Sequence, residues 1–200
     1  MGMNDFLTYL IAAAFLQNIV LTVGFGTSLT LKIVRRPGDI LYFGGLLSFF
    51  TLITVLIFYP LDNMMGVSPT AKLLRPLVLL LIAAVLYTVV ALVVKQWLPG
   101  LYSRIKRLLP MAVFNNVTVG TGLIINHRIN LPLSGAVGLA LGTSAGFLLI
   151  CWLMTEGIDR MGHTDVPPSF RGSPVKLLYL AILALALLGF SSEKITWFYR

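Results

Sequence analysis

Charged side chains are scarce in this sequence. Only 11% of its 200 residues are Asp, Glu, Lys or Arg, whereas 58% are hydrophobic. A soluble domain carries roughly 25% charged residues, and a chain of this length could not bury so much apolar surface away from water. The composition therefore excludes a soluble globular domain and predicts an integral membrane protein whose solvent is lipid.

Cysteine and histidine are nearly absent as well. The single cysteine, Cys151, excludes an intrachain disulfide, and the two histidines form no cluster with metal-ligand spacing. Cys151 lies in an apolar run, where we expect it to act as a small buried hydrophobe. The sequence also has no GxxxxGK phosphate loop, no HExxH and no Ser/His/Asp set. We therefore expect no metal site and no independent catalysis.

The net charge is +8, and the basic residues lie in short segments between apolar runs. They are not interleaved with aromatic residues in the way that RNA-binding patches are. This distribution argues against nucleic acid as a partner and indicates residues that set membrane topology and contact anionic lipid headgroups.

Six stretches without charge divide the chain. A bilayer-spanning helix needs about 20 apolar residues, and lipid leaves helices as the only structure for such runs because the backbone must satisfy its own hydrogen bonds. We therefore predict six transmembrane helices, with Pro60 closing the second and with Pro69 and Pro76 flanking the start of the third. The stretches are residues 6–31, 40–61, 76–94, 108–126, 129–155 and 177–192.

Lys and Arg are unevenly divided between the two ends of these helices. Ten lie on one side and five on the other, and the richer side is expected to be cytoplasmic. We therefore predict a multi-pass protein of the bacterial or archaeal cytoplasmic membrane with both termini outside. The ten are Lys32, Arg35, Arg36, Lys95, Arg104, Lys106, Arg107, Arg160, Arg171 and Lys176; the five are Lys72, Arg75, Arg128, Lys194 and Arg200.

The chain divides into two halves, residues 1–100 and 101–200, with three predicted helices each. An odd number of spans makes the second half enter the membrane from the opposite face, so halves that are structural repeats must be inverted repeats. The predicted fold class is therefore an all-α membrane domain of two inverted three-helix repeats, in which the first helix of each repeat is broken.

The first helix of each half mixes amides, hydroxyls and glycines, whereas the second, third and sixth helices are almost purely aliphatic or aromatic. Paired glycine-interrupted helices point to a functional site near the bilayer midplane, although the same residue types also serve in ordinary helix packing. With no charge in the hydrocarbon, an ion path would have to use amides, hydroxyls and carbonyls. The candidate pathway or helix-break residues are Asn18, Thr22, Gly24, Gly26, Thr27 and Ser28 in the first half, and Asn115, Asn116, Thr118, Gly120, Thr121 and Gly122 in the second.

Three glycines, Gly138, Gly142 and Gly146, recur at four-residue spacing in the fifth helix. Small residues on one helix face let another helix approach closely. We therefore predict that this face serves helix packing.

The loop before the last helix contains the sequence DVPPSFRG, at residues 165–172. It resembles the DVPxxxRG loop of the RnfA/NqrE family, which are small six-helix subunits of the Rnf complex and of the sodium-pumping NADH:quinone oxidoreductase. Leu109-Pro110 followed by Asn115 is similar to the LPLxxxNC segment of the family's fourth helix, and Asn18 with Leu21 is similar to its first helix. The residues of the loop motif are Asp165, Val166, Pro167, Pro168, Arg171 and Gly172.

The resemblance implies the inverted three-plus-three fold and a role in electron transfer coupled to ion movement. In the family, one cysteine in each broken helix, together with a pair from a homologous partner subunit, holds a two-iron two-sulfur cluster, and such clusters require thiolates or, less often, imidazoles. Here Ser28 and Asn116 occupy the two cysteine positions. We therefore expect this chain to bind no cofactor alone and to lack the family's iron–sulfur cluster.

Three hypotheses for the function remain open at this point. The first is a cluster-less subunit of an Rnf- or Nqr-like complex, paired with a homologous six-helix mate of the RnfE/NqrD type and with flavin-bearing membrane subunits. The second is a stand-alone transporter or channel with a midplane site at Asn18, Asn115 and Asn116. The third is a purely structural assembly subunit. In all three, the chain lies in a lipid bilayer.

Overall fold

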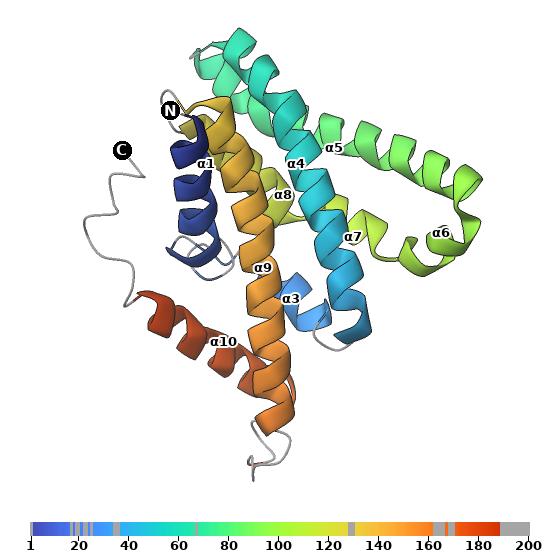
Figure 1. Ribbon diagram of the computed structural model, residues 1–200, viewed down its shortest axis with the longest axis vertical. Helices are drawn as coiled ribbons and strands as arrows, with labels where there is room; N and C mark the ends of the chain where they lie inside the picture. The colour runs from blue at the N-terminus through green and yellow to red at the C-terminus, as the bar shows by residue number, and fades with distance from the viewer. Residues whose placement is uncertain are drawn as a thin grey trace.

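The structure, a computed structural model, is built from helices alone in the part of the chain that it describes. The described residues are 2–16, 18, 21, 24, 26–33, 37–66, 68–127, 131–161, 167 and 171–188, with the backbone alone at residues 16, 37, 126, 127 and 188. In chain order, the elements labelled in Figure 1 and the short turns between them are α1 (Gly2–Ile11), the π-helical η1 (Ala12–Leu16), α3 (Thr27–Ile33), the 3-10 turn η2 (Pro37–Asp39), α4 (Ile40–Met65), α5 (Pro69–Trp97), α6 (Pro99–Ile105), α7 (Leu109–Val113), α8 (Asn116–His127), α9 (Leu133–Met161) and α10 (Ser173–Leu188).

Three of these helices, α4, α5 and α9, are long and apolar enough to cross a bilayer. A fourth crossing is formed if α6 and the segment Leu109–Ile125, which are inclined by 64°, count as one bent span. The segments Met3–Phe15 and Ser173–Leu187 are shorter apolar helices. The chain is therefore an all-helical, multi-pass membrane protein in its described part, and the expectation of six spans stays a prediction.

Two helices run past the boundaries that proline was expected to set. The helix α4 continues past Pro60, and α5 begins at Pro69 and contains Pro76 in its interior. The prediction that Pro60 closes the second helix is wrong. Of the two prolines predicted to flank the start of the third helix, Pro69 is its first residue and Pro76 lies within it. Proline removes one backbone hydrogen bond, but membrane helices tolerate it because neighbouring groups satisfy the freed carbonyl. The start of α5 is set instead by Ser68, whose hydroxyl accepts a hydrogen bond from the Ala71 amide at 3.2 Å.

The centre of the fold is the antiparallel pair of helices α4 and α9 (Figure 1). Gly44 lets the two helices approach, because a Cβ at this position would overlap the side chain of Leu148. The rings of Phe43 and Phe147 pack together with centroids 5.5 Å apart, and both side chains are fully buried. Such a ring pair contributes about 0.5–1.5 kcal/mol beyond its area burial. The two interrupted polar segments pack against this pair of helices.

Each interrupted segment packs on the central helix of the other half of the chain. The elements α1 and η1 contact α9, whereas α7 and α8 contact α4. A Cβ on Gly138 would overlap the carbonyl oxygen of Phe6. In the same way, a Cβ on Gly142 would overlap the carbonyl oxygen of Leu10. The backbone of α1 therefore lies directly on a glycine face of α9, which Gly146 continues one turn further along.

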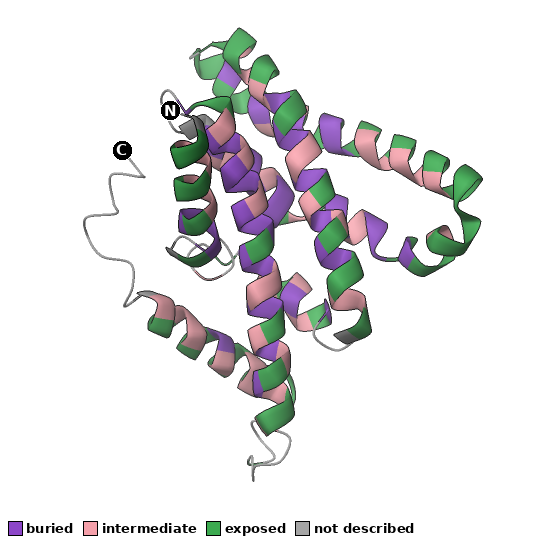
Figure 2. Ribbon diagram, viewed as in Figure 1, coloured by how far each residue is buried: buried purple, intermediate pink, exposed green. Residues whose placement is uncertain are grey.

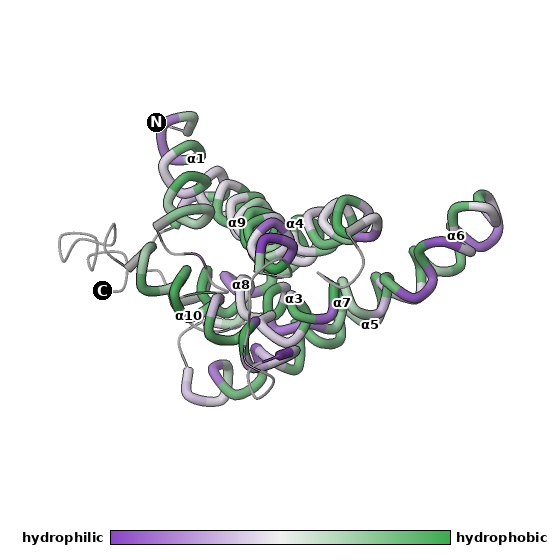
Figure 3. The backbone as a smooth tube through the Cα atoms, turned by 90° about the horizontal axis from the view of Figure 1, so that it is seen from below, coloured by the Kyte–Doolittle hydropathy of each residue, from purple (hydrophilic) through white to green (hydrophobic). Residues whose placement is uncertain are grey.

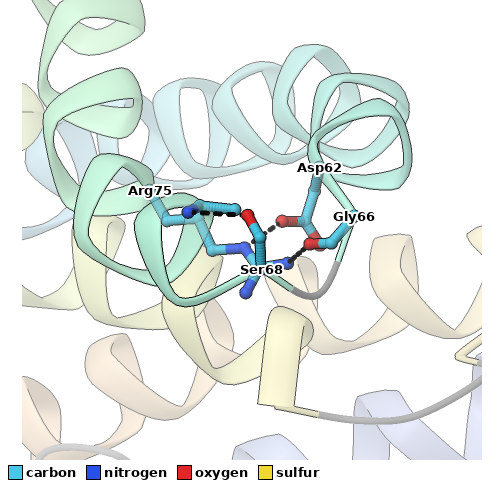
Figure 4. A network of polar contacts seen from close by, with 5 residues as sticks. Asp62, Gly66, Ser68 and Arg75 are labelled. Carbon is cyan, nitrogen blue, oxygen red and sulfur yellow. Dashed lines mark hydrogen bonds and ion pairs between the residues drawn. The ribbon is translucent and has the colours of Figure 1, made fainter.

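An ion pair fixes the turn between α4 and α5 (Figure 4). The Arg75 Nε donates to the Asp62 carboxylate at 2.6 Å, and the Arg75 Nη2 donates to the Gly66 carbonyl at 2.8 Å. The two side chains are only 10% and 17% exposed. Gly66 has a φ angle of 67°, which glycine adopts without strain. Both charges lie within helices because α4 and α5 extend beyond the uncharged stretches of the sequence.

The helices α5 and α6 lead away from the central pair, and α10 leads away from it on the opposite side (Figures 1 and 3). Figure 2 shows that the outer part of α5 is mostly exposed or half-buried. An outward apolar surface suits a hydrocarbon surrounding and is costly in water. The exposed side chains of α5 include Leu77, Leu81, Val85, Val89 and Leu92.

We expect Gly142→Ala to destabilise the protein, because the new methyl group would meet the Leu10 carbonyl oxygen and would lie 2.9 Å from the Ala13 Cβ. Overpacking of this kind costs about 1–3 kcal/mol. Gly45→Ala is the control, since a Cβ there meets nothing within 4 Å and alanine is the better helix former. The unfolding temperature of the detergent-purified chain measures both variants. Equal stability of the two would show that α1 does not lie on α9 as described.

Candidate functional site

The first polar segment is interrupted between η1 and α3. Gly24 and Gly26 have φ angles of 75° and 81°, which an α-helix does not contain and which glycine adopts without strain. The hydroxyl of Thr27, the first residue of α3, donates to the Gly24 carbonyl at 2.6 Å. The hydroxyl of Thr30 donates to the Gly26 carbonyl at 3.1 Å. The backbone amides of the same two threonines also donate to these carbonyls, Thr27 to Gly24 at 3.4 Å and Thr30 to Gly26 at 2.8 Å. Both glycine carbonyls are therefore satisfied within the segment.

The second polar segment is interrupted between α7 and α8, and Asn115 bridges the gap. Its Nδ2 donates to the carbonyls of Met111 and Ala112 at 2.9 and 2.6 Å, and its Oδ1 accepts a hydrogen bond from the Thr118 amide at 2.9 Å. The Ala112 carbonyl also accepts from the Thr118 hydroxyl at 3.1 Å. A single amide side chain thus closes the C-terminus of α7 and caps the N-terminus of α8.

The two interruptions lie against each other in the fold. A Cβ on Gly26 would come within 2.6 Å of the Val117 side chain in the first turn of α8 and within 3.0 Å of the Phe147 ring of α9. Glycine is therefore required at position 26 both for its φ angle and for this close approach. The structure thus brings together candidate residues that lie some 90 positions apart in the sequence.

The residues that follow the two breaks show the same pattern of exposure. Ser28 and Asn116, which are expected from the sequence to occupy the cysteine positions of the resembling family, are both exposed. Thr30 and Thr118, two positions later, are both 0% exposed. Residues two apart on a helix do not share a face. Each half-helix after a break therefore presents a polar residue outward and a threonine toward the protein interior.

Asn18 connects the first polar segment to the glycine face of α9. Its side chain is 2% exposed, and its Nδ2 donates to the Ala14 carbonyl at 3.1 Å. A Cβ on Gly146 would come within 2.7 Å of that nitrogen. Asn18 is therefore enclosed by the helix pair and does not reach the exposed side of the breaks.

The remaining candidates in α8 are also directed inward. Gly120 and Thr121 are buried, and the Thr121 hydroxyl donates to the Val117 carbonyl at 2.7 Å. A Cβ on Gly122 would lie 2.6 Å from the Leu79 side chain of α5. This turn of α8 therefore packs tightly on its neighbours. Of its three residues, two are glycines and only Thr121 carries a side chain.

The loop motif stands between α9 and α10 in the chain. Its described residues are Pro167, Arg171 and Gly172, and Gly172 has a φ angle of 93° directly before α10 begins at Ser173. The other motif residues and one candidate of the first polar segment lie outside the described residues: Asp165, Val166, Pro168 and Thr22.

The sequence-based search missed the contribution of α4. Thr51 and Thr54 are 0% and 1% exposed, and the Thr51 hydroxyl lies 3.3 Å from the Thr118 hydroxyl. The prediction that the second helix is almost purely aliphatic or aromatic overlooks these two hydroxyls. The signal was present in the sequence, because two threonines three residues apart share one face of a helix.

Hydroxyl and amide groups, rather than thiols, occupy the exposed positions of the two breaks. Neither Ser28 nor Asn116 offers the thiolate or imidazole that an iron–sulfur cluster needs. The one cysteine of the chain, Cys151, is 0% exposed in α9, where its thiol contacts the Thr30 side chain. The described residues contain no group of three His, Cys, Asp or Glu side chains that could hold a metal ion. This donor set does not fit an iron–sulfur cluster.

Asn115→Ala is expected to lower the stability of the chain by about 1–3 kcal/mol, because it removes the side-chain partner of the Met111 carbonyl before the break and of the Thr118 amide after it. Asn116→Ala is the matched control at the adjacent position, where the side chain is exposed, and a change within about 0.5 kcal/mol is expected. Thermal unfolding of the detergent-purified chain compares the two. A larger loss for Asn116→Ala would contradict the assignment of Asn115 as the residue that closes the break.

Comparison with known proteins agrees with the resemblance seen in the sequence. A family model described as Rnf-Nqr subunit, membrane protein, matches residues 6–192. The A subunit of the ion-translocating oxidoreductase complex from Actinobacillus pleuropneumoniae serotype 5b (strain L20) is 25% identical over 189 residues, which cover 94% of this chain and 97% of that protein. The corresponding protein of Rhodobacter capsulatus is 27% identical over 198 residues, with the same coverage of 94% and 97%. That of Pasteurella multocida (strain Pm70) is 26% identical over 190 residues, covering 94% and 98%.

The predicted family is therefore confirmed over nearly the whole length of the sequence. The match includes both interrupted segments and the central helices on which they pack. This chain belongs to the Rnf-Nqr family of membrane subunits.

Proposed function

We propose that this chain is a membrane subunit of an ion-translocating oxidoreductase complex of the Rnf or Nqr kind. The relatives named as subunits of such a complex match it along nearly their full length, so the likeness extends over the whole chain. The structural observation that carries the proposal is the exposure of Ser28 and Asn116 at the paired breaks. Polar groups beside interrupted helices are not left facing lipid, so this surface requires a protein partner.

The partner proposed for this surface is a homologous six-helix subunit of the RnfE/NqrD type, and flavin-bearing membrane subunits complete the complex. Besides Ser28 and Asn116, the exposed residues here include Gly24 and the aromatic Phe114, which is 46% exposed. Aromatic side chains are enriched in protein–protein interfaces. A surface that combines a helix break, hydroxyl and amide groups and an aromatic ring fits a protein neighbour better than it fits lipid.

We further propose that the chain is an inverted repeat of residues 1–100 and 101–200 with six membrane spans. The symmetry of the contacts supports this, because α1 packs on α9 just as α8 packs on α4. In the first turns after the breaks, an exposed residue, Ser28 or Asn116, is followed two positions later by a buried threonine, Thr30 or Thr118. The apolar segments that fall short of a full span in the described part, Met3–Phe15 and Ser173–Leu187, account for the remaining crossings.

In this proposal, the chain ligates no iron–sulfur cluster and binds no cofactor alone. The side chains exposed at the breaks are a hydroxyl and an amide. The one thiol, that of Cys151 in α9, is buried against Thr30 of α3. Electrons then pass through cofactors held by other subunits, flavins among them. The role left to this chain is to complete the helix interface and to line part of the ion or electron path with its interrupted segments.

The end of the bundle that carries Asp39 and Arg107 is proposed to face the cytoplasm. Arg107 and Asp39 lie 3.5 Å apart, which joins two of the basic segments at one end of α4. The Asp62–Arg75 pair lies at the other end of the same helix. The richer basic side then faces inward across the bacterial cytoplasmic membrane, and both termini lie outside.

Two alternative functions have less support. A stand-alone transporter would need free ligand groups at Asn18, Asn115 and Asn116. The amide nitrogens of Asn18 and Asn115 instead donate to backbone carbonyls of their own segments, and the Asn115 Oδ1 accepts from the Thr118 amide. A purely structural assembly subunit would use the same interface. The structural alternative differs from the proposed function in one expected result. Alanine at positions 28 and 116 would then leave the activity of the assembled complex unchanged.

Single cysteines introduced by Ser28→Cys and Asn116→Cys, labelled with a benzophenone maleimide, are expected to crosslink to a neighbouring subunit in native membranes. The background of the one native cysteine is low because Cys151 is buried. Leu81→Cys on α5, where the native side chain is 66% exposed, is the control and is expected to react mainly with lipid. Mass spectrometry identifies the adducts. Crosslinks from Leu81→Cys alone would place the partner on the other side of the protein.

Iron and acid-labile sulfide are expected to be absent from the purified chain, because its exposed donors cannot hold a cluster. The companion variant Cys151→Ala is expected to leave the iron content of the whole complex unchanged, since the thiol is 0% exposed in α9. Colorimetric iron and sulfide assays measure both. Stoichiometric iron on the chain, or loss of iron from the complex with Cys151→Ala, would overturn the cluster-less assignment while leaving membership of the complex intact.

A further inference from the structure

The helices α4 and α8, which pack together, carry four buried threonines: Thr51, Thr54, Thr118 and Thr121. We call this set the hydroxyl seam. Every member is at most 1% exposed, and each helix contributes two hydroxyls spaced three residues apart, on one helix face. The helices run side by side in the same direction along the seam.

Two side-chain contacts join α4 to α8 and to the segment that follows α8. The Thr51 and Thr118 hydroxyls lie 3.3 Å apart at one end. Further along, the Tyr59 hydroxyl donates to the Leu131 carbonyl, just beyond the end of α8, at 2.8 Å. Thr54 on α4 and Thr121 on α8 each lie three residues beyond the Thr51–Thr118 contact.

The direction of the hydrogen bonds in the seam follows from counting protons. The Thr118 hydroxyl has one proton and donates it to the Ala112 carbonyl, which can only accept. The contact between Thr51 and Thr118 must therefore use the proton of Thr51. The Thr121 hydroxyl likewise donates its proton to the Val117 carbonyl. The oxygens of Thr51 and Thr121 are left as acceptors.

Thr54 is the exception within the seam. Its Oγ1 is the buried side-chain oxygen that has no hydrogen-bond partner among the described residues. The other buried threonines of the protein with described bonds each donate to a backbone carbonyl or to another hydroxyl. Buried polar groups without a protein partner are commonly bonded to an enclosed water molecule.

We propose that the hydroxyl seam binds one internal water molecule at Thr54. A water molecule can accept the proton of Thr54 and donate to the free acceptor oxygen of Thr51, which lies one turn away on the same face of α4. A bare cation would use the oxygens but would leave the Thr54 proton without an acceptor. With the water in place, a continuous hydrogen-bonded chain runs from Thr54 to the Ala112 carbonyl at the helix break. This inference rests on the seam alone and is independent of the proposed function.

The test is Thr54→Val in the full chain within its native assembly, with Thr143→Val as the matched control. Thr143 is a buried threonine on α9 whose hydroxyl donates to the Leu139 carbonyl of its own helix. If the seam holds a water, Thr54→Val removes one of its partners and lowers the unfolding temperature by about 2–4 °C relative to Thr143→Val. The shift is expected to be the same in sodium, lithium, potassium and choline chloride. Thr54→Ser, which keeps the hydroxyl, is expected to retain more of the stability than Thr54→Val.

Two outcomes would overturn the proposal. An unchanged or raised unfolding temperature for Thr54→Val would mean that no water molecule is bound to the Thr54 hydroxyl. Removing an unpaired buried polar group relieves its desolvation cost. A stabilisation of the wild type by one monovalent cation that is lost in Thr54→Val would mean that a cation occupies the seam instead. An experimental density map that resolves ordered water decides directly, by the presence or absence of a peak within hydrogen-bonding distance of the Thr54 Oγ1.

Discussion

Inside a bilayer, each backbone carbonyl that a broken helix releases must find a donor within the protein, because lipid offers none. The rest of this structure depends on how that requirement is met at two places. At the first break, the hydroxyls and backbone amides of Thr27 and Thr30 donate to the carbonyls of Gly24 and Gly26. At the second, the Asn115 amide serves two carbonyls and one amide group. The polar residues nearest the breaks are thereby occupied with the backbone, which limits what they can offer to a ligand.

Close approach of backbones is the second determinant, and it depends on glycine. The chain places glycine where α1 crosses α9, where α4 meets α9, and where the two breaks touch. At each of these places a Cβ would collide with a carbonyl oxygen or a packed side chain. Without a hydrophobic driving force between helices in lipid, contacts of this kind are a main source of association. They hold the interrupted segments against the central pair of helices with little freedom to shift.

The two sides of the interrupted segments have different chemistry. The outward side presents Ser28 and Asn116 beside exposed backbone, whereas the inward side presents threonines that bond to carbonyls and to the hydroxyl seam. A member of the Rnf-Nqr family can therefore keep the packed inner side while the outward donors change. Here the outward groups are a hydroxyl and an amide, which can form hydrogen bonds but do not suit iron.

The sequence by itself determined the solvent, the helical class, the family and the two polar segments, because each of these depends on composition and on local runs of residues. It misplaced the ends of the second and third helices, since proline is a weak stop signal once neighbouring groups satisfy the carbonyl that it frees. Tertiary structure alone decided that Gly26 meets Val117, that Asn115 spans its own break, and that Thr51 and Thr54 face α8. These are contacts between segments far apart in the chain, and which helix faces meet is set by packing across the whole bundle rather than by any local pattern of residues.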